Sequence, residues 1–452
     1  MANAFVNIFK IKELRNKILF TIGILIVYRI GAQIPVPGIN FTALKLFLQS
    51  QSGGGNPLFE YFNFFAGGAF DNMSIFALGI MPYITTSIIM QLLLMIMPSL
   101  KRLSEEDGGR KKINQFIRLG TLPVCILQSF LTINFINSLP EEVVVMSPKI
   151  LFYISTVVIT TTGTIILMWL GEQISQKGIG NGISLIIFAG IVARVPGAIK
   201  QLFDKVQRGE LDIPVVLAIL IMFIFVIALV IYEQQGQRKI PVNYAKRIVG
   251  RKVYGGAPNT YLPLKINPSG VIPIIFANSL LIAPSTLSSL FAGVGWIEAI
   301  GRAMTPGSVV YMIVYSLLII FFAYFYTQVT LNPKEIAKNI RENGGSIPGV
   351  PVNKVEEYLT KILNRIVLPG SIFLAFIAII PTIIVALIPE FPASFAYLLG
   401  GTSLIIIVGV DLDTMSQIES HLKMHHQDGL VKKGRIRSRN ILWYYIEKYR
   451  II

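Results

Sequence analysis

The chain consists of long apolar runs separated by shorter polar segments. A helix needs about 20 mostly apolar residues to cross the hydrocarbon core of a bilayer. Ten runs fit this requirement, and they cover residues 18–34, 74–97, 116–137, 151–170, 183–203, 214–232, 271–291, 309–331, 367–388 and 394–411. The pattern therefore predicts an all-α polytopic membrane protein with ten transmembrane helices.

Positive charge alternates from one polar segment to the next. Most of the 40 Lys and Arg residues lie before the first run, within 98–118, 233–270 and 332–365, and after residue 411. Segments rich in Lys and Arg stay on the cytoplasmic side of a membrane. An even number of spans returns the chain to the side on which it began. Both termini are therefore expected to be cytoplasmic.

One apolar segment, NPLFEYFNFFAGGAF at Asn56–Phe70, is too short to cross a bilayer. It lies between the first two runs, is dense in aromatic residues and ends in small ones. Its residues alone favour an amphipathic helix that lies on the outer membrane surface.

Two polar loops are longer than a connection between neighbouring helices requires. In Arg238–Lys265, Val, Tyr and Ile alternate with basic residues, which predicts a short β-hairpin. In Asn332–Arg365, Pro333 is expected to begin a helix that the pair Gly344–Gly345 ends, before a second helix leads into the next span. Such long basic loops are candidate docking surfaces for RNA or an acidic partner. The alternative is that they are only solvated, positively charged loops.

The composition agrees with a membrane protein and excludes an internal disulfide. Hydrophobic residues make up 53% of the 452 residues and charged residues 14%, with a mean hydropathy of +0.64. Soluble domains carry nearer a quarter charged residues. Cys125 is the single cysteine, and the net charge of +16 suits an anionic membrane surface or RNA. The first run lacks a small-residue cleavage site and is interpreted as a retained span rather than a signal peptide.

The predicted spans contain few polar groups. Arg29 lies near the outer end of the first span, where its side chain is expected to extend toward the membrane surface. Glu172 and Asp411 fall at cytoplasmic ends. The uncharged polar residues inside the spans are expected to form hydrogen bonds between helices; they are Thr85, Thr86, Gln91, Asn278 and Gln328. Proton- or ion-coupled transporters usually place ionisable groups at the midplane, so this pattern argues against a small-molecule secondary transporter.

No catalytic or metal-binding set is evident, so the chain is not expected to be an enzyme or to hold a cofactor. The three histidines are His421, His425 and His426; the first two share i, i+4 spacing but have no carboxylate or Cys partner. GIGNG at Gly178–Gly182 lacks the full phosphate-loop pattern and is interpreted as a tight turn with Asn181 as a helix N-cap. An intramembrane enzyme would need a nucleophile–base pair or a metal set within the spans.

Five long phrases carry a resemblance to a known family. They are SIFALGIMPYITTSIIMQLL (Ser74–Leu93), GIGNGISLIIFAGIVA (Gly178–Ala193), PVNYAKRIVGRKVYGG (Pro241–Gly256), LPLKINPSGVIPIIFA (Leu262–Ala277) and GGTSLIIIVGV (Gly400–Val410). In this order, over nearly the whole chain, they resemble the SecY family, the large channel subunit of the bacterial Sec protein translocase. The resemblance implies two five-span halves, 1–209 and 210–411, related as an inverted repeat around a central pore. Residues 412–452 would form a cytoplasmic tail.

The resemblance also implies how the pore is closed. The segment 56–70 would fold back from the outside and plug it, with the residues Phe59, Phe62, Phe64, Phe65, Gly67 and Gly68. A ring of aliphatic side chains would narrow it, at Ile80, Ile84, Ile183, Ile187, Ile275 and Ile406. Such a ring offers ions no replacement for their hydration shell and seals around many side chains.

A lateral gate and two docking loops are implied in the same way. The second and third spans would part from the seventh and eighth, at Thr85, Gln91, Asn278 and Ala283. The loops 233–270 and 332–366 would bind a motor or a ribosome, through Arg247, Arg251, Lys252 and Lys354. The second loop departs from the family, because PGVPVN at Pro348–Asn353 stands where a PGIRPG-like pattern is usual. This departure removes the expected arginine, and Lys354 is the candidate to compensate.

The implied function is a protein-conducting channel in the cytoplasmic membrane. It would pass unfolded secretory proteins outward and release membrane helices sideways into lipid. The expected partners are a SecE-like clamp subunit, a SecG-like subunit, the SecA ATPase, the ribosome, polypeptides that bear signal sequences, and membrane lipids. The alternative from another class is a small-molecule secondary transporter.

Overall fold

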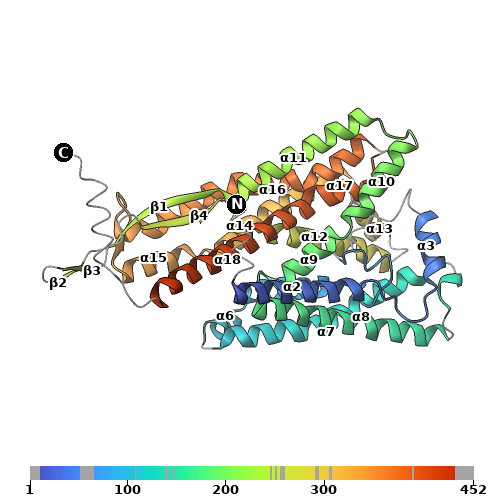
Figure 1. Ribbon diagram of the computed structural model, residues 1–452, viewed down its shortest axis with the longest axis horizontal. Coiled ribbons are helices and arrows are strands. Elements are labelled where there is room, and N and C mark those ends of the chain that lie inside the picture. Colours follow the sequence, from blue (N-terminus) through green and yellow to red (C-terminus); the bar gives the residue numbers. More distant parts are fainter. Residues whose placement is uncertain are drawn as a thin grey trace.

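Helices account for most of the structure. The computed structural model describes residues 11–50, 66–106, 108–137, 141–145, 148–244, 247–249, 252–254, 260–290, 295–304, 308–388 and 391–432. In the first half of the chain the helices are α2 (Lys12–Gly31), α3 (Phe41–Ser50), α5 (Met81–Ile96), α6 (Pro98–Glu105), α7 (Gly109–Asn137), the 3-10 helix η1 (Glu141–Val143), α8 (Lys149–Lys177), α9 (Gly182–Val192) and α10 (Val195–Gln207). Figure 1 shows α2, α7 and α8 running side by side along the long axis.

The second half adds longer helices and a small sheet. Its helices are α11 (Ile213–Gln235), α12 (Ile272–Leu290), α13 (Gly295–Ala303), α14 (Val309–Thr330), α15 (Pro333–Glu342), the 3-10 helix η2 (Val352–Lys354), α16 (Val355–Leu387), α17 (Ala393–Leu399) and α18 (Gly401–Lys432). Its strands are β1 (Gln237–Tyr244), β2 (Arg247–Val249), β3 (Lys252–Tyr254), β4 (Thr260–Lys265) and β5 (Gly345–Ser346). In Figure 1, the β1–β4 pair, α6 and α15 lie toward one end of the molecule, while α3 and α13 lie toward the other.

Each of the ten apolar runs overlaps a helix, but three runs do not form one continuous helix. Residues 74–80 are turns, and the helix of the second run begins only at Met81. The fifth run divides between α9 and α10, and the tenth between α17 and α18. Of the described helices, six are long and apolar enough to cross a membrane, or seven if the bent pair Met81–Ile96 and Pro98–Ser104 counts as one span. The number ten stays a prediction.

The predicted β-hairpin is confirmed. Strand β1 pairs antiparallel with β4, with Gln237 opposite Lys265 and Val242 opposite Thr260, and its far end pairs with β5. Ile240 and Val242 alternate with exposed residues and point into a second apolar core formed with α15 and α16. The expected helix at Pro333 is also confirmed, because α15 begins there and ends before Gly344, whose φ is +66°. The hairpin therefore belongs to a packed unit rather than to a loose loop.

Glycines let the helices of the first half approach one another closely. A Cβ added at Gly182 of α9 would lie 1.8 Å from the carbonyl oxygen of Gly171 in α8. A Cβ added at Gly163 of α8 would lie 2.1 Å from the carbonyl oxygen of Ile75. Because backbone atoms at these distances have no free rotamer by which to move away, the two glycines are required for the observed packing.

We expect Gly182→Ala to destabilise the protein. The new methyl group would overlap a backbone carbonyl, and overpacking of this kind costs about 3 kcal/mol. Thermal unfolding of the purified protein in detergent measures the effect. Gly197→Ala in α10 is the matched control, since a Cβ added at Gly197 would have nothing within 4 Å and alanine favours a helix. A Gly182→Ala protein that is as stable as the Gly197→Ala control would contradict this packing.

Candidate functional site

The turn between α8 and α9 positions the first half of the candidate pore. Asn181 caps α9 as the sequence predicts, because its side chain accepts hydrogen bonds from the backbone N–H groups of Ile183 and Ser184. Three further side chains accept hydrogen bonds from backbone N–H groups of the same turn; they are Ser175 from Gly182, Thr21 from Ile179, and Gln417 from Gly180. Thr21 belongs to α2 and Gln417 to α18, so the turn joins the beginning and the end of the chain.

The six isoleucines predicted to form the ring lie in one apolar core. Four of them are buried: Ile80, Ile84, Ile187 and Ile406. Ile183 and Ile275 are partly buried and pack against the same cluster of buried residues. This cluster is large and draws on both halves of the chain, so it is consistent with a ring but does not define one.

Only the end of the predicted plug lies within the described residues. Phe59, Phe62, Phe64 and Phe65 fall outside them, whereas residues 66–70 form turns. Ala66, Ala69 and Phe70 are buried in the same cluster as the ring isoleucines. Gly67 and Gly68 adopt φ values of +64° and +82°, which glycine tolerates far better than other residues. The end of the segment therefore packs inside the protein, not on an outer surface.

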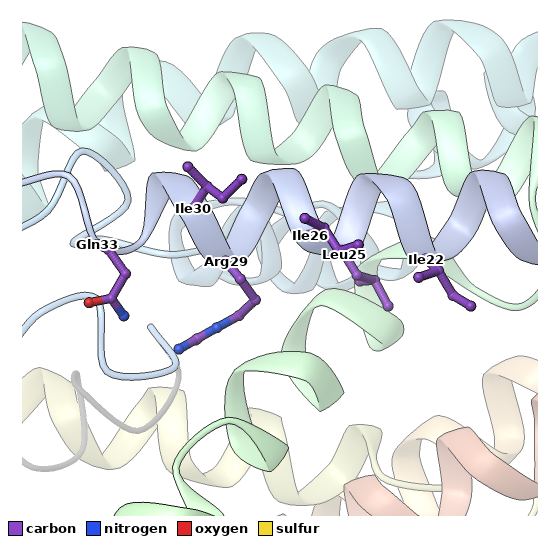
Figure 2. A pocket seen from close by; sticks show the side chains of 6 residues that line it. All are labelled: Ile22, Leu25, Ile26, Arg29, Ile30 and Gln33. Carbon is purple, nitrogen blue, oxygen red and sulfur yellow. The ribbon is translucent and has the colours of Figure 1, made fainter.

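Two side chains of α2 bind this segment, and the sequence does not indicate either contact. The Tyr28 hydroxyl donates to the carbonyl oxygen of Ala66 at 3.3 Å, and the Arg29 guanidinium donates to that of Gly67 at 3.0 Å. The expectation that Arg29 extends toward the membrane surface is therefore wrong. Figure 2 shows its side chain extending away from α2 on the same side as that of Gln33, while Ile30 points to the other side of the helix. The only sign of this contact in the sequence is a single arginine within an apolar run.

The predicted gate residues have different surroundings. Helices α5 and α12, which would face one another across the gate, contact each other. Asn278 is buried in α12. Thr85 donates to the carbonyl of Met81 in its own helix, and Gln91 is partly buried. Ala283 lies in α12, and its side chain is outside the described part.

The other polar residues of the spans also favour bonds within a helix. Thr86 donates to the carbonyl of Pro82 at 2.8 Å and lies 3.4 Å from that of Gly120 on α7. Gln328 is exposed. The expectation of bonds between helices thus holds in part for Thr86 and is wrong for Thr85, and for Asn278 it stays a prediction.

The candidate docking residues lie on the polar loops. Arg247 and Lys252 belong to strands β2 and β3, which pair with one another, while Arg251 falls outside the described residues. Lys354 is exposed at the start of α16. Arg341 donates to the carbonyl of Val352 and so ties α15 to the PGVPVN segment. Lys354 therefore lies next to the packed unit formed by the β1–β4 hairpin, α15 and α16.

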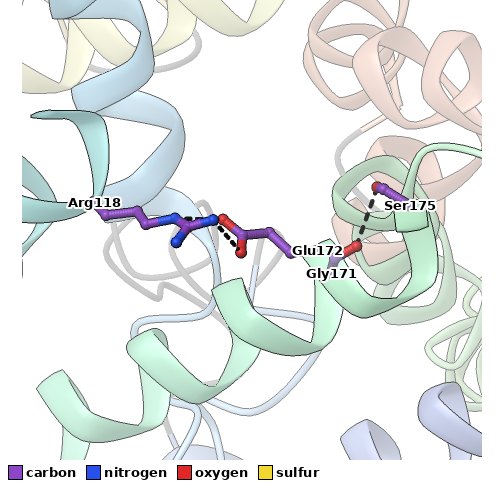
Figure 3. Close-up of polar contacts among 4 residues, drawn as sticks. All are labelled: Arg118, Gly171, Glu172 and Ser175. Carbon is purple, nitrogen blue, oxygen red and sulfur yellow. Dashed lines mark hydrogen bonds and ion pairs between the residues drawn. The ribbon is translucent and has the colours of Figure 1, made fainter. Parts of the chain in front are cut away.

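One charged pair within the first half was not predicted. Arg118 of α7 donates to both carboxylate oxygens of Glu172 of α8, from Nε at 2.8 Å and from an Nη nitrogen at 2.6 Å. Figure 3 shows the two side chains pointing toward one another, with Ser175 turned to the carbonyl of Gly171 one helical turn away. The pair joins two neighbouring helices close to the α8–α9 turn. Both residues were visible in the sequence, but nothing in their spacing indicates that they meet.

The arrangement offers no group for chemical catalysis in the part of the chain that the structure describes. No group of three or more His, Cys, Asp or Glu residues there could hold a metal ion. The site is an apolar core that contains irregular backbone. It is formed together by residues 66–80, α5, α9, α12 and α18. Such a core suits a closure that opens and reseals rather than a reaction.

The chain matches one family model and closely related sequences. The family model described as SecY matches residues 74–415. The chain is 43% identical to the protein translocase subunit SecY of Chlamydia muridarum, with 96% of this chain and 98% of the relative covered. It is 42% identical to the subunit of Escherichia coli strain K12, over 94% and 95%. It is 44% identical to that of Aquifex aeolicus, over 92% and 96%.

Solved structures resemble the fold over nearly its whole length. A structure described as that of a protein-conducting channel matches with a TM-score of 0.62 at 21% identity, covering 90% of this chain and 92% of the other. Sec61 in a canine ribosome–channel complex matches with a TM-score of 0.60 at 20% identity, over the same shares. At these identities the likeness concerns the fold alone.

We expect Arg118 and Glu172 to be energetically coupled. A two-point ion pair that is half exposed is worth about 1 kcal/mol, because water still screens part of it. A double-mutant cycle with Arg118→Met and Glu172→Gln, read out by unfolding of the purified protein, measures this coupling. Lys338 and Glu342, an exposed i, i+4 pair in α15, are the control and should couple by about 0.3 kcal/mol. Equal coupling energies in both pairs would show that Arg118 and Glu172 stabilise the protein no more than an ordinary exposed pair does.

Proposed function

This chain belongs to the SecY family of protein translocase subunits, and on that premise we propose how its parts form and close a protein-conducting channel. The observation that carries the proposal is the shared core of Ala66, Ala69 and Phe70 with the six isoleucines from α5, α9, α12, α18 and the turn before α5. An end of the plug segment that packs in the same core as the ring is the arrangement that a closed, resealable pore requires. The channel is not an enzyme, so a partner supplies the driving force.

The proposed ring is Ile80, Ile84, Ile183, Ile187, Ile275 and Ile406. Apolar side chains exclude hydrated ions because they replace none of the water that an ion would lose. The same side chains contact any passing residue by dispersion and give no preference for particular sequences. Residues 56–70, with Phe59, Phe62, Phe64, Phe65, Gly67 and Gly68, would close the resting pore, and aromatic contacts would stabilise that closed state.

The proposed halves are residues 1–209 and 210–411, each with five spans. A tail would follow from residue 412. Helix α18 runs through residue 412 without a break, so the tail would begin as a continuation of the last span. The chain is a multi-pass membrane protein, and we propose that both termini lie in the cytoplasm. The Lys- and Arg-rich segments and the β1–β4 hairpin support this orientation.

We further propose that α5 and α12 form the seam through which membrane helices leave, near Thr85, Gln91, Asn278 and Ala283. The partly buried Gln91 and the buried Asn278 would make this seam weakly polar and reversible. A leucine-rich signal helix would stabilise the open seam by apolar contact with lipid and protein.

Partners are proposed from the family. A SecE-like clamp and a SecG-like subunit would complete the complex, and either the SecA ATPase or a ribosome would deliver the polypeptide. Arg247, Arg251, Lys252 and Lys354 are the candidate docking residues. A small-molecule secondary transporter remains the rival of another class, but among the described residues no group of three or more His, Cys, Asp or Glu residues could hold an ion to support it.

We expect the reconstituted complex to translocate a secretory precursor. The chain and its SecE-like partner are placed in liposomes with SecA and ATP, and protection of the precursor from added protease is measured. Protection that requires ATP supports the channel. Uptake of a small solute without protection of the precursor would favour the transporter instead. If the precursor is not protected, although the same partners work on a control channel, the SecA assignment is contradicted. The PGVPVN loop would then be the first place to look for the cause.

We expect Ile406→Thr to raise the resting ion conductance several-fold above Ile406→Val. The two variants have nearly the same shape, so only the hydroxyl group, which binds water in the constriction, distinguishes them. Conductance across a planar bilayer measures the difference. Equal conductance of the two variants would place Ile406 outside the ring.

A further inference from the structure

We propose that Tyr28 and Arg29 form a releasable clamp that holds the plug segment in its closed position. This inference rests on the plug assignment above and adds the residues that set its resting state. The clamp consists of two adjacent side chains on α2 and two adjacent carbonyl groups, those of Ala66 and Gly67. It grips the predicted plug at Ala66 and Gly67, shortly before the segment ends at Phe70.

The two donors suit a clamp because of their surroundings. Tyr28 is 1% exposed, and the guanidinium of Arg29 lies 6.0 Å from the centre of the Tyr28 ring. A charged donor in an apolar environment strengthens its hydrogen bond, since little water competes for the acceptor. Five N–H groups let the guanidinium hold a carbonyl at several angles. Arg29 is partly buried, so losing this partner would leave its charge only partly solvated, and Arg29 therefore favours the state in which Gly67 stays in place.

Close packing of Gly67 against Gly190 of α9 also holds the segment. A Cβ added at Gly67 would lie 2.5 Å from the Cα of Gly190 and 2.6 Å from the Tyr28 hydroxyl oxygen. Gly190 belongs to α9, the helix that carries Ile183 and Ile187. The backbone at Gly67 is therefore enclosed between α2 and α9. Movement of α9 when the ring widens would loosen the same contact that Arg29 secures.

A second anchor nearby is of a different kind. The backbone of Met73 accepts a hydrogen bond from Val36, and the backbone of Ile75 donates one to Ile34. Asn72 also donates to the carbonyl of Ala32. This short ladder ties residues 72–75 firmly to the chain just after α2.

The difference between the two anchors gives the segment a fixed base and a movable end. Release of Ala66 and Gly67 breaks two side-chain bonds, whereas release of residues 72–75 would break a backbone ladder. Between them Gly68 has a φ of +82°, and the non-glycine residue Met73 has a φ of +42°. The plug would therefore swing about residues 68–72 and return to the same clamp after each chain has passed.

The test is the resting ion conductance of the complete complex in a planar bilayer. We expect Arg29→Met to raise it about tenfold, since loss of one strong hydrogen bond shifts a closed-to-open equilibrium by about that factor. Arg29→Lys keeps the charge and should restore part of the closure. Tyr28→Phe removes only the hydroxyl group and should give a rise of a few-fold. Wild-type conductance in Arg29→Met would overturn the clamp.

A second measurement separates gating from general damage. The clamp predicts that Arg29→Met admits a precursor with a weakened signal sequence, because less work is needed to open the channel. Arg118→Met removes an arginine of the same half that contacts Glu172 instead of the segment, and it should behave as wild type. If Arg118→Met opens the channel as much as Arg29→Met does, the effect is loss of stability and the clamp is wrong.

Deletion of residues 56–65 distinguishes failure of the clamp from failure of the plug assignment. The deletion leaves Ala66 and Gly67 in the chain and should raise the conductance by itself. Adding Arg29→Met to the deletion should then raise it no further, because the clamp would hold only Ala66 and Gly67 and no longer the plug that they carry. If the deletion leaves the conductance unchanged, the plug assignment is wrong. If the deletion raises the conductance but Arg29→Met does not, only the clamp is wrong.

Discussion

The structure depends on one constraint: a polar backbone group inside an apolar environment has no water to bind and must find its partner within the protein. Helices meet this requirement over most of the apolar runs. The turns at residues 66–80 meet it by contacts with neighbouring helices and within the turns themselves. Ser74 donates its backbone N–H to Ala69, and Thr164 of α8 donates its hydroxyl to the carbonyl of Gly79. Irregular backbone is tolerated in a membrane where protein surrounds it, and here it lies at the candidate pore.

The same constraint explains where the charged and polar side chains lie. Arg118 and Glu172 neutralise one another between two helices, and Arg29 binds a carbonyl group of the turns. Thr21 and Gln417 supply acceptors to a turn whose N–H groups have no helical partner. Each of these side chains takes the place of a missing partner. If the bonds of Tyr28 and Arg29 hold the plug as proposed, the channel would open when these two are exchanged, without rebuilding its helices.

Two of the apolar clusters lie at different places along the helices. The large cluster lies between the candidate spans, while the cluster of β1, β4, α15 and α16 packs beyond the apolar stretch of α16. Helix α16 runs from Val355 to Leu387 and contributes to both. A force applied by a partner at the polar loops would therefore act on a rigid unit that is continuous with a spanning helix. This continuity suits the docking function proposed for the loops.

The sequence by itself determined the elements. The apolar runs, the alternation at Ile240 and Val242, the start at Pro333 and the cap at Asn181 all depend on neighbours in the chain, and each of these elements is present. Family resemblance supplied the ring and the plug, which local pattern did not distinguish from ordinary packing. Only the tertiary structure decided that Arg29 turns inward to Gly67, that Gln417 meets Gly180, and that the second run begins with turns. These contacts join residues up to 237 positions apart, and which distant carbonyl lacks a partner is a property of the folded chain.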